Sequence, residues 1–145
     1  MRTESFFVPG EPKTKGSWIP IRRGRHMTVI PDNKKSKNWE KVVAGYALAK
    51  WGNRPEAGPV SIEMTFHLTR PRSHYGTGRN QDTIKASSPA EPIGHNTGDI
   101  DKLTRCVLDA LTGIVYKDDS QVTCNQAQKM YAIDEAGVLI TIGTK

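Results

Sequence analysis

Long apolar runs and cysteines are scarce in this chain of 145 residues, and each scarcity excludes a class of protein. No apolar stretch approaches the roughly 20 residues that a membrane-spanning helix needs, so we expect no membrane partner. The first ten residues, MRTESFFVPG, contain no signal-peptide hydrophobic region, which favours a cytoplasmic location. The two cysteines, Cys106 and Cys124, give neither a disulfide framework nor a zinc-ligand spacing, and we expect both to be reduced and buried.

Acidic residues are also in the minority, with 15 Asp and Glu against 21 Lys and Arg and a net charge of +6. Such a balance favours an anionic partner, of which nucleic acid is the commonest, over a generic basic protein. The basic residues concentrate in the first third of the chain and recur in a later loop. The predicted DNA contacts are Lys13, Lys15, Arg22, Arg23, Arg25, Lys34, Lys35, Lys37, Arg70 and Arg72, with Trp18 as a base-stacking candidate.

The spacing of apolar residues predicts a single α+β domain over residues 1–145, with helices packed on a sheet. Alternation is clearest over residues 60–68, where polar and apolar side chains take turns as in a half-buried strand. The other expected elements are a strand at 5–8, a loop at 10–33, a helix at 36–51 capped by Ser36, a helix at 101–111, and an antiparallel pair of strands at 121–132 and 138–144.

Residues 70–97 are rich in Pro, Gly, Ser, Asn and charged residues and show no periodicity. This stretch is too long for a turn in a compact domain. Two interpretations stay open: a disordered insertion, or a flexible basic loop that becomes ordered on DNA.

Aspartates flank the second predicted helix on both sides, with Asp99 and Asp101 before it and Asp118 and Asp119 after it. Carboxylates held close together repel one another, and a hard divalent cation such as Mg²⁺ offsets that cost. Asp101 lies at the predicted helix start. Asp99 reaches the same ion only if it lies in extended chain just ahead of the helix.

Helical spacing also places Asp101, Arg105 and Asp109 along one stripe, away from the apolar Leu103 and Val107. Each aspartate has a simpler interpretation. Asp101 could be only a helix cap, Asp109 could pair with Arg105, and Asp118, Asp119 and Ser120 could form only a turn.

The combination of these residues is more specific than any one of them. It comprises Asp99-x-Asp101, Leu103, Asp109-Ala110-Leu111, Gly113, Asp118-Asp119 and Gln121-Val122, preceded far upstream by Val8-Pro9-Gly10. This string resembles the core of the RusA-type Holliday-junction resolvases, endonucleases common in bacteriophages and prophages.

The resemblance implies a two-layer α+β fold, a homodimer, and paired nicking of four-way DNA junctions with Mg²⁺ or Mn²⁺ and no small-molecule cofactor. It implies that Asp99, Asp101 and Asp119 bind the metal ion. Asp109 and Asp118 would then support the site by orienting ligands. Where the family often has a catalytic lysine this chain has Arg105, and where it often has asparagine the chain has Lys102, so either cation could stabilise charge on the phosphate.

The expected reaction is metal-assisted hydrolysis of a DNA phosphodiester in recombination or repair. Asp119 could return along the helix to the first two aspartates, or meet them across a dimer interface. Two alternatives stay open: a DNA-structure-binding protein without catalysis, and a broader nuclease that acts on forks or flaps.

Overall fold

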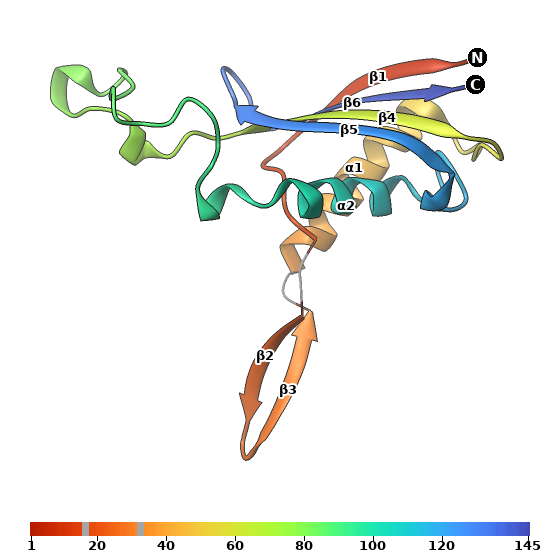
Figure 1. Ribbon diagram of the computed structural model, residues 1–145, viewed down its shortest axis with the longest axis horizontal. Helices are drawn as coiled ribbons and strands as arrows, with labels where there is room; N and C mark the ends of the chain where they lie inside the picture. The colour runs from red at the N-terminus through yellow and green to blue at the C-terminus, as the bar shows by residue number, and fades with distance from the viewer. Residues whose placement is uncertain (16–17, 32–33) are drawn as a thin grey trace.

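A mixed sheet of four strands forms the body of the protein (Figure 1). The structure is a computed structural model that describes residues 1–15, 18–31 and 34–145. The strands lie in the order β1, β6, β4, β5, with bounds β1 Thr3–Pro9, β4 Val60–Leu68, β5 Val122–Tyr131 and β6 Gly137–Thr144. Strand β6 runs antiparallel to both β1 and β4, whereas β4 and β5 run parallel.

Two helices, α1 (Lys34–Trp51) and α2 (Ile100–Leu111), cover one face of this sheet (Figure 1). Trp39, Val43, Ala47 and Trp51 recur every four residues on α1 and are all buried, because this spacing puts them on one side of the helix. The predicted α+β class, with helices packed on a sheet, is confirmed. Among the described residues, no helix has the length and apolar character needed to cross a membrane.

The strand pairing departs from the prediction at the C-terminal end of the chain. The sequence favoured an antiparallel pair of β5 and β6, but β4 lies between them and pairs with both. Strand β4 takes the central position because alternate residues along it are fully buried, among them Ile62 and Phe66. Its parallel pairing with β5 requires a long crossover, which contains α2.

Residues 10–33 are not the continuous loop that was expected. They contain a hairpin of β2 (Trp18–Arg23) and β3 (His26–Pro31), which projects away from the sheet and the helices (Figure 1). Gly24 adopts a positive φ of 62° in the two-residue turn, a conformation that suits glycine. Basic residues and prolines obscured the strand pattern of this segment, in which Ile19 and Ile30 are register partners.

Two smaller expectations also need correction. Helix α1 begins at Lys34, so Ser36 is a buried residue inside the first turn and not the cap. Cys124 on β5 is exposed, whereas Cys106 on α2 is buried as expected.

Residues 70–97 follow an irregular path that is held by internal hydrogen bonds. The loop contains three short 3₁₀ turns, η1 (Arg72–His74), η2 (Gly78–Asn80) and η3 (His95–Thr97). The Arg70 guanidinium donates to the Pro89 carbonyl oxygen at 2.7 Å and stacks over the Tyr131 ring. The mobility of this loop stays a prediction.

Candidate active site

The start of helix α2 presents two carboxylates to solvent. Asp99 occupies the N-cap position in extended conformation, with φ −75° and ψ 136°, and its side chain makes no capping hydrogen bond. Asp101 follows in the first turn and is exposed. The predicted break between extended chain and helix is therefore present, and the carboxylate of Asp99 is not used as a cap.

Gly98 allows the chain to make this break. Its φ is +84°, and a Cβ atom there would lie 2.8 Å from the Thr14 side chain. Any other residue would meet both an unfavourable backbone conformation and a steric clash. The glycine before Asp99 thus fixes the direction in which the chain enters α2.

The two faces of α2 differ as the helical spacing predicts. Leu103, Val107 and Leu111 are essentially inaccessible to solvent and belong to the core. Asp101 and Arg105 are exposed on another face. Asp101 and Arg105 consequently remain available to a ligand.

A lysine accompanies the acidic pair. Lys102 Nζ lies 3.4 Å from Asp99 Oδ2. Arg105 forms no ion pair within the part of the chain that the structure describes. Of the two cations considered from the sequence, Lys102 touches the acidic pair, while Arg105 stands free one turn along the helix.

Lys129 of strand β5 is a residue that the sequence analysis missed. Its ammonium donates to the Gly98 carbonyl oxygen at 2.7 Å and to the Thr97 hydroxyl oxygen at 2.9 Å. It therefore fastens the segment that carries Asp99 to the sheet. One lysine in a strand with no other charged residue was the available signal.

Asp119 lies toward the opposite end of α2. It opens the short turn η4 (Asp119–Gln121), directly before β5 begins. Strand β5 extends about 23 Å from Val122 to Lys129, at roughly 3.3 Å per residue, before it reaches the segment of Asp99. Among the described residues of one chain, no group of three or more His, Cys, Asp or Glu is placed to hold a metal ion.

Asp118 caps the turn η4. Its Oδ1 accepts a hydrogen bond from the Ser120 backbone N–H at 2.8 Å, and the Gln121 side chain accepts one from the Asp118 N–H in return. The Ser120 hydrogen bonds lower the pKa of the Asp118 carboxyl below its ordinary value. The structure thus gives Asp118 the turn-forming role that was the simpler interpretation of this residue.

Asp109 pairs with Lys15 and not with Arg105, the partner in its simpler interpretation. The Lys15 ammonium lies 3.2 Å from Asp109 Oδ2 on α2 and 2.6 Å from Glu40 Oε1 on α1. The hydrogen bond to Glu40 is the main cause of a raised pKa of Lys15. Lys15 therefore bridges the two helices, a role that competes with the DNA contact predicted for it.

Cys106 lies beside this bridge. Its Sγ is 3.7 Å from the Ser36 carbonyl oxygen and is buried between the helices. Burial, with the nearby Glu40 carboxylate, raises the pKa of the Cys106 thiol to about 12. This thiol is a packing group and is protonated at neutral pH.

The predicted DNA contacts separate into three groups. The first group is exposed and comprises Arg22 and Arg25 of the hairpin and Lys35 and Lys37 of α1. The second group is Arg70 and Arg72, whose guanidinium groups already donate hydrogen bonds to carbonyl oxygens within loop 70–97. The side chains of Trp18, Arg23 and Lys34 lie outside the described part of the structure.

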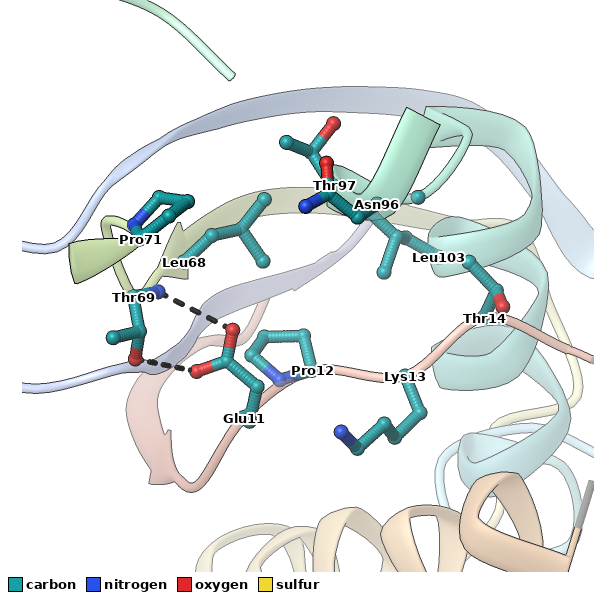
Figure 2. Close-up of a pocket in the computed structure, with 11 residues that line it drawn as sticks. Glu11, Pro12, Lys13, Thr14, Leu68, Thr69, Pro71, Asn96, Thr97 and Leu103 are labelled. Atoms are coloured by element: carbon teal, nitrogen blue, oxygen red, sulfur yellow. Dashed lines mark hydrogen bonds between the residues drawn. The ribbon is translucent and has the colours of Figure 1, made fainter. Parts of the chain in front are cut away.

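A cavity of about 250 Å³ adjoins the segment before Asp99 (Figure 2). Figure 2 shows the Glu11 carboxylate accepting hydrogen bonds from the Thr69 backbone N–H and hydroxyl, at 3.2 and 2.7 Å. Gly98 and Leu103 border the cavity, and Lys13 lines it from the N-terminal segment. The cavity lies beside the acidic pair and does not contain it.

Two comparisons with known proteins cover nearly the whole chain. The model of the family described as endodeoxyribonuclease RusA matches residues 9–143. An uncharacterized protein, YqaN, of Bacillus subtilis (strain 168) is 33% identical over 132 residues, which cover 88% of this chain and 87% of that protein. The family match includes the acidic pair, Lys129, Asp119 and the basic hairpin.

Proposed function

The chain belongs to the RusA endodeoxyribonuclease family, and from this premise we propose that it resolves four-way DNA junctions by metal-dependent phosphodiester hydrolysis. The observation that carries the proposal is the exposed pair Asp99 and Asp101 at the start of α2, on a chain of net charge +6. A basic protein attracts the DNA backbone, but two exposed carboxylates with a single lysine beside them would repel it. A bound cation reconciles the two features.

The donor atoms at this position suit a hard divalent ion. Asp99 has no capping hydrogen bond, so its oxygens are available as ligands, and carboxylate oxygens are what Mg²⁺ prefers. We assign Asp99, Asp101 and Asp119 to the ion, which is Mg²⁺ with Mn²⁺ as a substitute. When bound, the ion would lower the pKa of a water molecule and neutralise charge on the phosphate.

Lys102 and Arg105, the two cations of α2, have different proposed roles in the reaction. Lys102 neutralises Asp99 in the free protein and is near enough to turn toward a phosphate oxygen. Arg105 is exposed one turn further on and stays charged at any working pH, so it stabilises the phosphate electrostatically and donates no proton. Asp109 acts through its pairing with Lys15, which holds α1 against α2.

The basic hairpin is the proposed DNA-binding surface. Residues 18–31 contain no acidic residue, and Arg22 and Arg25 are exposed near the turn. Lys35 and Lys37 at the start of α1 would continue the surface toward the body. The phosphate backbone of a branched DNA supplies a matching negative charge.

We also assign this activity to a homodimer, because nicking two strands symmetrically requires two sites related by a two-fold axis. DNA as the substrate favours a location in the bacterial cytoplasm, and the family's distribution favours a phage or prophage origin.

Cleavage of a synthetic four-way junction with Mg²⁺ tests the proposal. The wild-type chain should cut two opposed strands, and Asp101→Asn should lose at least about 100-fold in rate, because a metal ligand is removed. Asp134→Asn, an exposed aspartate in the turn before β6, is the matched control and should cut normally. An inactive wild-type protein, or an active Asp101→Asn, would refute the proposal.

Arg105 supports a second candidate function, binding of branched DNA without cleavage, because it replaces the lysine that the family often has. Tight junction binding in EDTA, with the DNA intact in both Mg²⁺ and Mn²⁺, would favour that candidate. Fork and flap substrates in the same assay separate a broader nuclease from a junction resolvase.

A further inference from the structure

Strand β5 forms an outer edge of the sheet that lacks the usual protection against pairing. It is ten residues long and contains neither proline nor an acidic residue. Its single charged residue is Lys129, whose ammonium turns toward Thr97 and Gly98. Residues 123–126 and Gln128 are exposed. Natural proteins usually shorten, charge or cover such an edge, because its free N–H and C=O groups invite another strand.

The opposite edge of the sheet shows what this protection looks like. Strand β1 is seven residues long, ends in Pro9 and carries Glu4, which pairs with Arg2 at 3.7 Å. Both edges belong to the same sheet, so the difference in their protection comes from the sequences of the two strands. The contrast between an unprotected β5 and a protected β1 at the opposite edge indicates that β5 has a partner.

The open face of β5 is also compatible with a neighbouring strand. The helices cover the other face of the sheet (Figure 1). The Gln128 side chain donates to the Thr65 hydroxyl at 3.2 Å, and Thr65 alternates with buried residues of β4, so this contact lies on the open face. Cys124 and Gln126 share the parity of Gln128 along the strand and so lie on the same face. No bulky charged group of β5 stands between this edge and a second strand.

We infer that β5 pairs antiparallel with β5 of a second copy of this chain, and that this pairing brings Asp119 of the partner subunit to Asp99 and Asp101. The functional half of the inference rests on the proposed nuclease activity. The pairing itself rests only on the strand edge.

A single two-fold axis would account for both the strand pairing and the shared site. An axis through the middle of β5, at Gln126, places each end of the strand beside the opposite end of its copy. Lys129 is tied to the segment of Asp99, and Asp119 opens the turn η4 that precedes the other end of β5. Within one chain, about 23 Å of strand lies between Val122 and Lys129. Across the axis, Lys129 lies one strand spacing of about 4.8 Å from residue 123 of the second copy, so the turn that carries Asp119 of the partner subunit lies at the same end of the paired strands as Asp99 and Asp101.

The same symmetry yields two identical sites. Each would take Asp99, Asp101 and Lys102 from one subunit and the third aspartate from the other. Within one chain the described residues hold no group of three metal-binding side chains, so the site would be complete only in the dimer.

A disulfide test locates the interface without any assay of activity. Residues on a two-fold axis face their own copies, at a Cα separation that a disulfide can span. The variant Cys124→Ser/Gln126→Cys should therefore give a covalent dimer on a non-reducing gel. The matched variant Cys124→Ser/Ser5→Cys, on the protected edge β1, should remain a monomer on that gel. A crosslink through residue 5, or none through residue 126, would overturn the pairing.

Mixing two inactive variants tests the shared site. Asp101→Asn and Asp119→Asn should each be inactive alone. In a mixed dimer the shared-site arrangement leaves one site with all three aspartates, so unfolding and refolding the two together should restore about a quarter of the wild-type activity. If each site belongs to one chain, the mixture stays inactive.

The outcomes separate the two proposals. A wild-type protein that cuts junctions, with an inactive mixture, overturns the shared site and leaves the proposed function standing. A residue-126 crosslink in a protein that cuts no DNA supports the pairing and overturns the proposed function.

Discussion

The ammonium of Lys129 on β5 lies 2.7 Å from the carbonyl oxygen of Gly98, the residue directly before Asp99. A strand at the edge of the sheet is thereby fastened to the start of the helix that carries the candidate metal ligands. The same ammonium also donates a hydrogen bond to the Thr97 hydroxyl oxygen. The position of Asp99 is therefore set by long-range contacts as well as by the helix it precedes.

Replacing Lys129 with methionine should weaken the site without removing a ligand. The substitution keeps the length of the side chain but loses both hydrogen bonds, so Asp99 would be less well oriented. We expect a 10- to 100-fold loss, about that seen when groups supporting metal ligands are removed, and a higher Mg²⁺ concentration for half-maximal cleavage. Lys117→Met, at an exposed lysine near η4, is the matched control. Equal Mg²⁺ requirements in both variants would show that Lys129 does not position Asp99.

Lys15→Met should destabilise the fold. The change leaves the Glu40 and Asp109 carboxylates facing each other without their shared cation, and we expect a loss of about 1 to 2 kcal/mol in the free energy of unfolding. Urea denaturation at neutral pH measures it. Lys13→Met, two residues earlier in the chain, should leave the urea midpoint unchanged.

The stabilisation by Lys15 should depend on pH in a defined direction. Its pKa is raised above the ordinary value of 10.5, so the folded state holds the proton more tightly than the unfolded state. The contribution is complete below pH 10.5 and is lost as the pH rises through the raised pKa. The stability difference between wild type and Lys15→Met should therefore shrink in strongly alkaline solution.

The buried thiol of Cys106 should cause a second loss of stability at alkaline pH. The pKa of its thiol is raised from 9.0 to about 12, so the unfolded chain releases this proton at a lower pH than the folded protein. Between pH 9 and pH 12 the unfolded state binds fewer protons, and stability falls as the pH rises. Cys106→Ala should reduce the slope of stability against pH in that range, although it costs some stability at every pH. An unchanged slope would contradict the buried, neutral thiol.

The hairpin arginines should contribute to DNA binding through charge. Arg22→Ala and Arg25→Ala should each weaken junction binding in EDTA and reduce the slope of log K against log salt by about one. Arg54→Ala, an exposed arginine after α1, is the control for net charge. A salt slope that changes equally in all three variants would show that the hairpin has no special contact with DNA.

Local patterns carried much of the fold. The alternation over residues 60–68 gave β4 at its observed bounds, and the helical spacing of apolar residues from Trp39 to Trp51 gave helix α1. These patterns succeed because burial acts on each side chain according to the direction it takes from its own backbone. The extended conformation of Asp99 followed from a different argument, the requirement that it bind the same metal ion as Asp101.

Strand neighbours did not follow from local patterns. Strands β5 and β6 are consecutive and antiparallel in direction, so a hairpin was the natural expectation, but β4 separates them. The β2–β3 hairpin was missed because basic residues and prolines interrupt its alternation. The partners of Lys15 and Lys129 were equally hidden, since each contacts residues more than 20 positions away.

The sequence by itself determined the helices, the central strand, the charged stripe of α2 and the residue types that suit a metal-dependent nuclease, because these depend on composition and periodicity. Only the tertiary structure decided that Asp119 lies at the far end of α2 from Asp101, that Lys129 fastens the segment of Asp99, and that β5 forms an unprotected edge. The physical reason is that these features depend on which strands pair and in which order. That order is set by burial of the whole core and is not encoded in any one segment.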